Sequence, residues 1–243
     1  IKLKNNRLVK SSRGANGVIV ITTKRAKSGD ASVSYFGSTG ISSFAQNSSF
    51  IDVMDQYQFK ANLPSNTSSD ILAENGLYNW QDLIFRNAMT SNHDVTISKA
   101  GLTSSTRLSV GANLQNGIVQ KTGMDKYTVS FTNTNNLFDN KLNLQTRVLY
   151  STIEDQRGLL TNNAGYQGNL LGSALYWRPT LNTRTAGGDY TFIAEDYINP
   201  EHLLDAFDSN TTTNRLLASV TASLQLSDKL TFKNLYAVDN SVS

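Results

Sequence analysis

The sequence contains no cysteine, only three prolines and no long apolar run. The absence of cysteine excludes disulfide bonds, thiolate chemistry and cysteine-ligated metal sites. No stretch approaches the roughly 18 consecutive apolar residues that a transmembrane helix needs. A strand of a membrane β-barrel needs only about 9–11 residues with one apolar face, so a barrel is not excluded by this absence.

Charge is also scarce. Charged residues make up 17% of the chain, and the net charge of +3 is small and spread along it, so it gives no argument for a nucleic-acid partner. We expect none. Hydrophobic residues make up 39%, with 10 tyrosines and 10 phenylalanines, and serine, threonine and asparagine are plentiful. This composition is typical of an all-β protein and not of a disordered chain.

Residues that could carry chemistry are few. His93 and His202 are far apart and lack the spacing of metal ligands, so we expect both to be hydrogen-bonded structural residues. The acidic pairs Glu154-Asp155 and Glu195-Asp196 fall in expected loops, where solvated charge is the simpler interpretation than acid–base catalysis or calcium binding. No nucleophile and base converge. We therefore expect no catalytic residue, no metal and no cofactor.

The strongest pattern is a strand-like alternation of apolar and polar residues. It predicts that Val110, Val129, Val148 and Val220 lie on one face of a sheet, with Ser109, Ser130, Arg147 and Ser219 on the other. Seven segments show it: 31–44, 92–98, 106–115, 127–132, 142–151, 216–226 and 230–239. The sequence therefore predicts seven strands.

Alternation alone also fits a two-layered β-sandwich. The links between strands distinguish the two architectures, because short links at 99–104, 137–141 and 227–229 alternate strictly with longer ones. The longer links are 45–91, 117–124 and 154–213, and a short helix is expected at 52–61 within the first of them. Short turns on one rim and long loops on the other are typical of a transmembrane barrel.

A small-residue turn stands near the start of the chain. It reads Ser12-Arg13-Gly14-Ala15-Asn16-Gly17 and is followed by Val-Ile-Val-Ile and Thr22-Thr23-Lys24. Gly14 and Gly17 can take positive φ, so the residues predict a turn that leads into a short buried strand. The stretch closely resembles the end of the plug domain of SusC/RagA-type TonB-dependent outer-membrane transporters. In that comparison Arg13, Gly14, Asn16 and Gly17 form the turn at the plug exit.

The resemblance continues along the chain in the same order. It includes Asn79-Trp80-Gln81-Asp82, Asn92-His93, Asn116-Gly117-Ile118-Val119, Asn199-Pro200 and Thr213-Asn214-Arg215-Leu216. It implies that residues 1–27 are the C-terminal end of a plug domain and residues 28–243 the N-terminal part of a barrel, with 45–91 and 154–213 as extracellular loops. Since plugged outer-membrane transporters have about 22 strands, we expect the seven strands to be part of a larger antiparallel transmembrane β-barrel.

The resemblance also implies a function. It predicts import of a bulky nutrient, an oligosaccharide or a peptide, through a barrel embedded in outer-membrane lipid. A SusD-like surface lipoprotein would act as a lid, and the TonB complex would pull on the plug. The alternative is a non-transporting β-barrel or β-sandwich in a surface adhesion or structural assembly.

Three neighbours in the second long loop are the candidates for contact with the lid or the substrate. They are Tyr176, Trp177 and Arg178, because aromatic residues and arginine are enriched at the cores of interfaces. For Trp177 the alternative is packing within its own loop. We expect Trp80 to pack structurally.

Overall fold

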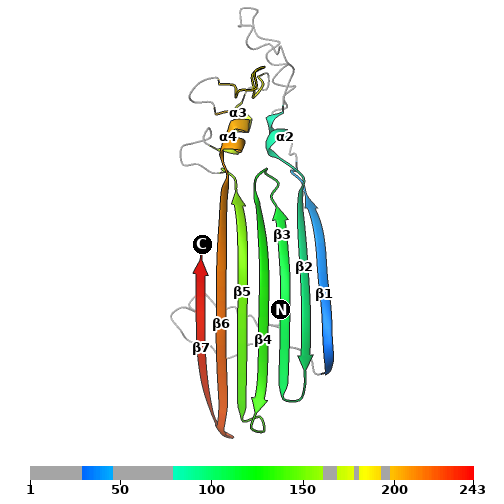
Figure 1. The fold of residues 1–243 in the computed structure, drawn as a ribbon, viewed down its shortest axis with the longest axis vertical. Helices are drawn as coiled ribbons and strands as arrows, with labels where there is room; N and C mark the ends of the chain where they lie inside the picture. Colours follow the sequence, from blue (N-terminus) through cyan, green and yellow to red (C-terminus); the bar gives the residue numbers. More distant parts are fainter. Residues whose placement is uncertain (1–28, 46–78, 161–168, 178–180, 193–197) are drawn as a thin grey trace, which may run out of the picture.

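The computed structural model describes residues 29–45, 79–160, 169–177, 181–192 and 198–243. They form one antiparallel sheet whose seven strands follow each other in chain order (Figure 1). The strands are β1 Gly29–Ser42, β2 Ala88–Ala100, β3 Ser104–Asn116, β4 Gly123–Leu137, β5 Leu142–Arg157, β6 Ser209–Ser227 and β7 Leu230–Val242. The prediction of seven strands is therefore confirmed.

Among the described residues, three short helices accompany the sheet. They are α2 Trp80–Ile84, α3 Leu170–Tyr176 and α4 Pro200–Ala206, and Figure 1 shows them together beyond the upper end of the strands. None of the helices in the described ranges has the length and apolar character needed to cross a membrane.

The connections alternate in length as predicted. Three short turns, at 101–103, 138–141 and 228–229, join β2 to β3, β4 to β5 and β6 to β7 at the lower end of the sheet in Figure 1. The β3–β4 turn and the described parts of the two long connections lie at the upper end. In the β4–β5 turn, Phe138, Asp139 and Asn140 all have positive φ, between 51° and 68°, which reverses the chain within four residues.

The strand register gives the sheet two different faces. Directly paired residues point to the same side, and the row Tyr35–Val95–Val110–Val129–Tyr150–Leu216 runs across six strands on one side. The opposite side carries the row Ser34–Thr96–Ser109–Ser130, which continues into Leu149 and Leu217. We name these the apolar face and the polar face. Their assignment agrees with the predicted alternation, and Leu149 and Leu217 are apolar exceptions on the polar face.

The strand ends differ from the predicted boundaries. Strand β2 begins at Ala88, β5 continues to Arg157 and β6 begins at Ser209, so the long connections are 43–87 and 158–208, not 45–91 and 154–213. Most of the added residues are polar, and pairs such as Asp155 with Thr211 extend the ladder beyond the alternating segment. Backbone hydrogen bonds need no apolar side chains, so alternation underestimates strand length.

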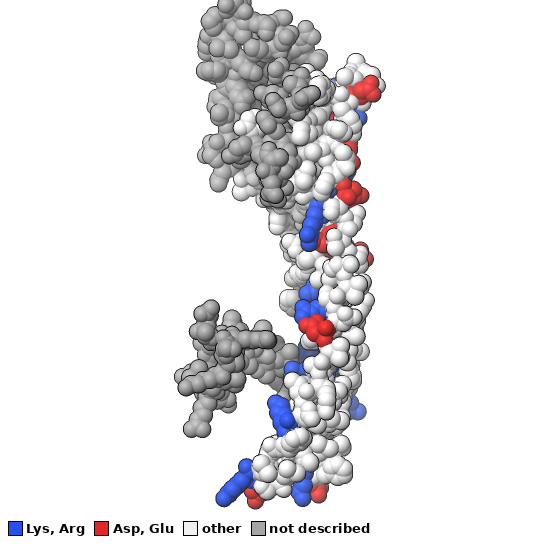
Figure 2. Space-filling view, turned by 90° about the vertical axis from the view of Figure 1, so that its left-hand side faces the viewer, with Lys and Arg blue, Asp and Glu red and all other residues white. Residues whose placement is uncertain are grey.

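The sheet is a single layer. Figure 2 views it edge-on, with basic side chains mainly on its left-hand side. Within the described ranges no second sheet packs on either face, so those residues do not form the sandwich kept open as an alternative. The predicted plug end at 1–27 and the predicted helix at 52–61 lie outside the described residues.

Candidate functional site

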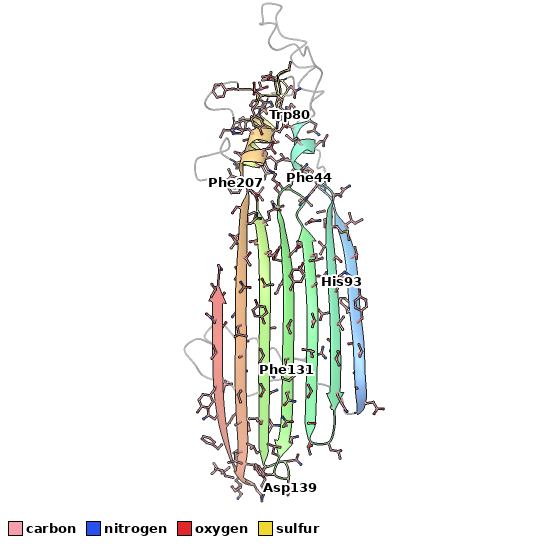
Figure 3. All side chains as sticks on the ribbon, viewed as in Figure 1. Phe44, Trp80, His93, Phe131, Asp139 and Phe207 are labelled. Carbon is pink, nitrogen blue, oxygen red and sulfur yellow. The ribbon has the colours of Figure 1, made fainter. Side chains whose placement is uncertain are left out.

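The buried core of the described residues lies at the upper end of the strands and not on the sheet. It contains Trp80, Ile84, Val119, Leu170, Ala174, Trp177 and Leu204, which come from α2, the β3–β4 turn, α3 and its C-terminal end, and α4. We call these helices, together with the turns 117–122 and 181–192, the cap. Figure 3 shows Trp80 among the crowded side chains of this end of the molecule. The long connections therefore contain ordered structure, as expected.

Each helix of the cap begins at an asparagine. The side chains of Asn79, Asn169 and Asn199 accept hydrogen bonds from backbone N–H groups in the first turns of α2, α3 and α4. Helices of five or seven residues are marginal alone, so packing into the shared core must stabilise them. The Asn-Pro motif at 199–200, noted in the sequence, forms the capped start of α4.

The β3–β4 turn is fixed to the end of α2. Arg86 donates from Nε to the Gly117 carbonyl at 3.0 Å and from Nη2 to the Thr122 carbonyl at 2.8 Å. Gln120 donates from Nε2 to the carbonyl of Leu83 at 2.9 Å. Sequence reasoning missed Arg86 and Gln120, because their partners are more than thirty residues away.

A charged cluster holds the turn 181–192 against α4. The Arg184 guanidinium pairs with Glu201 at 2.7 Å and Asp205 at 3.1 Å, and it lies 4.3 Å from the centre of the Tyr190 ring. Its pKa is raised, first because it donates a hydrogen bond to the Glu201 carboxylate. Lys121 of the β3–β4 turn reaches Asp205 at 3.7 Å. The cluster thus joins two of the upper connections.

Asn199 is the most connected polar side chain of the cap. It is 5% exposed; its Oδ1 accepts from the N–H groups of Glu201 and His202, and its Nδ2 donates to the carbonyls of Thr183 and Thr191. Asn199→Ala is therefore expected to destabilise the cap by about 2–4 kcal/mol, through loss of the N-cap and two unpaired carbonyls. Hydrogen exchange of α4 measures this change. Asn182→Ala, at an exposed position, is the matched control, and equal protection of α4 in both variants would contradict the prediction.

The predicted contact residues are placed differently from one another. Trp177 is 2% exposed and donates from Nε1 to the Leu181 carbonyl at 3.1 Å, so it presents no surface to a partner in this structure. The indole of Trp177 fills the cap core, so the structure agrees with the alternative interpretation, packing within its own loop. Tyr176 is 50% exposed and keeps the predicted contact role as a proposal. Arg178 lies outside the described residues, as do Arg13, Gly14, Asn16 and Gly17. Trp80 is buried, as predicted.

Both histidines are held by neighbours. The two ring nitrogens of His93 are hydrogen-bonded, Nδ1 to the Tyr35 hydroxyl and Nε2 to the Ser91 hydroxyl, each at 2.7 Å. The ring of His202 lies 4.6 Å from that of Tyr190. Figure 3 places His93 within the sheet, on β2. In the ranges that the structure describes, no three His, Asp or Glu side chains gather in a way that could hold a metal ion.

The polar face carries a network of short hydroxyl and amide side chains. Asn113 donates to the side chain of Asn92, Thr96 and Ser109 share a hydrogen bond of 2.8 Å, and Arg107 donates to Thr96 at 3.3 Å. The network links neighbouring strands β2 and β3. It gives the face a hydrophilic surface with many neutral hydrogen-bonding groups.

Sequence comparison finds relatives among bacterial receptors, although no protein-family model matches. The chain is 36% identical over 134 residues to TonB-dependent receptor SusC of Bacteroides thetaiotaomicron, which covers 54% of this chain and 13% of that protein. It is 27% identical over 243 residues to TonB-dependent receptor P26 of Formosa agariphila and 25% identical over 229 residues to receptor P3 of the same organism. These alignments cover 94% and 93% of this chain and 23% and 22% of the two receptors.

Solved structures share the fold. The RagAB peptide transporter superposes with a TM-score of 0.76 at 17% identity, covering 95% of this chain and 30% of the matched chain. The RagAB peptide importer in its closed-closed state gives 0.71, with 96% and 30% covered. The chain therefore spans less than a third of each relative. Its architecture is that of the corresponding part of these importers.

Proposed function

We propose that this chain, a relative of SusC in sequence and of RagA-type importers in fold, forms part of a TonB-dependent transporter that imports a bulky nutrient across the outer membrane. The substrate class is an oligosaccharide or a peptide, and the protein moves it without chemical conversion. The observation that carries the proposal is the agreement of two comparisons, sequence identity to SusC and a fold match over 95% of the chain.

The two-faced sheet supports this role. Its apolar face exposes large side chains such as Val33, Ile97 and Val238, which suits contact with lipid hydrocarbon. Its polar face suits a hydrated lumen. In lipid, the outer backbone groups of β1 and β7 need partners, which further strands of a closed barrel would supply. Within this proposal residues 1–27 end the plug and residues 28–243 belong to the barrel.

The proposed orientation follows from the connections. The short turns face the periplasm and the cap faces the outside, where loops are long in outer-membrane barrels. A SusD-like lipoprotein then closes over the cap side, and the TonB complex acts on the plug from the periplasm. The cap supports this assignment because it is an ordered module with a buried core, suited to hold a constant surface toward a partner.

Uptake in cells tests the function. A strain that lacks the whole protein is expected to lose import of its nutrient, and a strain with the protein but without TonB should show the same loss. Labelled oligosaccharides and peptides, supplied separately, would identify the substrate class. Unchanged uptake of every nutrient in the deletion strain, together with altered surface adhesion, would favour the non-transporting alternative.

The lid partner is tested at Tyr176 and Arg178. Replacing both by Ala is expected to reduce co-purification of the lipoprotein at least severalfold, because aromatic and arginine residues contribute strongly to interfaces. The amount of barrel in the membrane should stay the same. Leu102→Ala, in the exposed β2–β3 turn on the opposite rim, is the control. Full recovery of the lipoprotein with the double variant would remove these residues from the interface.

A further inference from the structure

A depression lies on the polar face over the middle strands β2, β3 and β4. Its volume is about 570 Å³. Asn92, Asp94, Ser109, Gly111, Asn113 and Lys126 are among the residues that line it, with Thr128 and Ser130 on its β4 side. All of these residues belong to the polar face by register. The depression is therefore open to the proposed lumen.

Gly111 creates the depression. It is paired with Asp94 on β2 and with Thr128 on β4, so the row across the face lacks one side chain between them. The Asp94 carboxylate leans over this gap, because a Cβ built on Gly111 would lie 3.0 Å from its Oδ2. The carboxylate therefore takes up the space over Gly111, and a ligand in the depression meets it between β2 and β4.

Two opposite charges border the depression without a partner among the residues that the structure describes. Neither the Asp94 carboxylate nor the Lys126 ammonium has a hydrogen bond or ion pair within the described ranges, whereas Arg215 and Asp239 on the same face pair through two hydrogen bonds. The amides of Asn92 and Asn113 are fixed by their mutual bond. The free acceptor Asp94 and the free donor Lys126 therefore border a surface on which the amides of Asn92 and Asn113 are held in place.

An aromatic ring completes the arrangement. Phe36 is paired with Asp94, lies on the polar face and is 64% exposed. Directly paired side chains have Cβ atoms about 4.5–5.5 Å apart, so Phe36 adjoins Asp94 on the β1 side, next to the residues that line the depression. The row across the sheet continues from Phe36 through Asp94, Gly111, Thr128, Ser151 and Arg215. A large exposed apolar ring beside these small and polar side chains suits a ligand with an apolar side of its own.

We propose that Phe36, Asp94, Gly111 and Lys126 form a subsite for one pyranose unit of a neutral glycan; this rests on the proposed function and narrows its substrate class. The C–H side of a pyranose packs on an aromatic face, and a carboxylate accepts hydrogen bonds from two neighbouring hydroxyls. Lys126 donates to further sugar oxygens. A peptide fits less well, because β2, β3 and β4 are paired on both sides and leave no strand edge for backbone recognition.

Binding by the purified full-length protein tests the subsite. An array of neutral glycans identifies the tightest ligand, whose dissociation constant is then measured by calorimetry. We expect the dissociation constant for this glycan to rise at least tenfold in Asp94→Asn and in Phe36→Leu. In Phe36→Tyr it should stay within about threefold of the unmodified protein, because this variant keeps the ring. Ser219→Ala, on the polar face of β6, is the matched control and should bind as the unmodified protein does.

The outcomes distinguish failure of the proposed subsite from failure of the proposed transport function. Unchanged glycan affinity in Asp94→Asn and Phe36→Leu overturns the subsite, as does an array on which no neutral glycan binds or a protein that binds only peptides. In each of these cases, uptake that still depends on the whole protein leaves the proposed function standing. If uptake does not depend on the protein, the proposed function fails by itself.

Gly111→Ser, which places a side chain in the gap, should weaken glycan binding in parallel with Asp94→Asn.

Discussion

Replacing Trp177 by Ala is expected to destabilise the cap by about 3–5 kcal/mol, the cost of deleting a large buried aromatic side chain. Trp177 is 2% exposed and packs in one cluster with residues of α2, α3, α4 and the β3–β4 turn. Its removal leaves a cavity among helices too short to persist without packing. None of the residues of that buried cluster lies in a strand of the sheet. The amount of barrel in the membrane should therefore change little.

Hydrogen exchange separates this local effect from global unfolding. In Trp177→Ala the amides of α3 and α4 should lose protection and the cap should become sensitive to proteases, whereas the strands keep their protection. Tyr176→Ala is the matched control, since the neighbouring side chain is half exposed. Equal protection of the cap in both variants would show that Trp177 does not hold it together.

Val220→Arg is expected to destabilise the protein in lipid by about 2–4 kcal/mol if the position lies near the membrane midplane. Val220 is 40% exposed on the apolar face, where it pairs with Thr146 and Tyr236. Exposure of this kind is costly for a charge when the surrounding solvent is hydrocarbon and harmless when it is water. The substitution therefore reports the solvent at this face.

Ser219→Arg is the control for the same strand. Ser219 is the preceding residue, on the polar face beside Arg147 and Ala237, and an arginine there should cost much less. Reversible unfolding in lipid vesicles measures both variants. Similar costs for the two substitutions would mean that the apolar face does not meet lipid.

The sequence by itself determined the architecture of the sheet. Alternation has a period of two residues, which is a local property, so it placed Val110, Val129 and Val220 on one side and Ser109 and Ser130 on the other before any pairing was known. Turn and loop lengths are equally local, and their alternation correctly ordered the two rims. The apolar–polar alternation ends before the strands do, because residues such as Asp155 and Thr211 pair through their backbones without alternating in polarity.

Only the tertiary structure decided the cap and the depression. The burial of Trp177 depends on neighbours from α2 to α4 and the β3–β4 turn, so its own surroundings in the sequence fit a buried and an exposed ring equally well. The gap at Gly111 exists because the register brings Asp94, Gly111 and Thr128 into one row. Periodicity assigns each residue to a face, but the row in which it stands depends on how far each strand is shifted against the next, and that shift is fixed by contacts between residues distant in the chain.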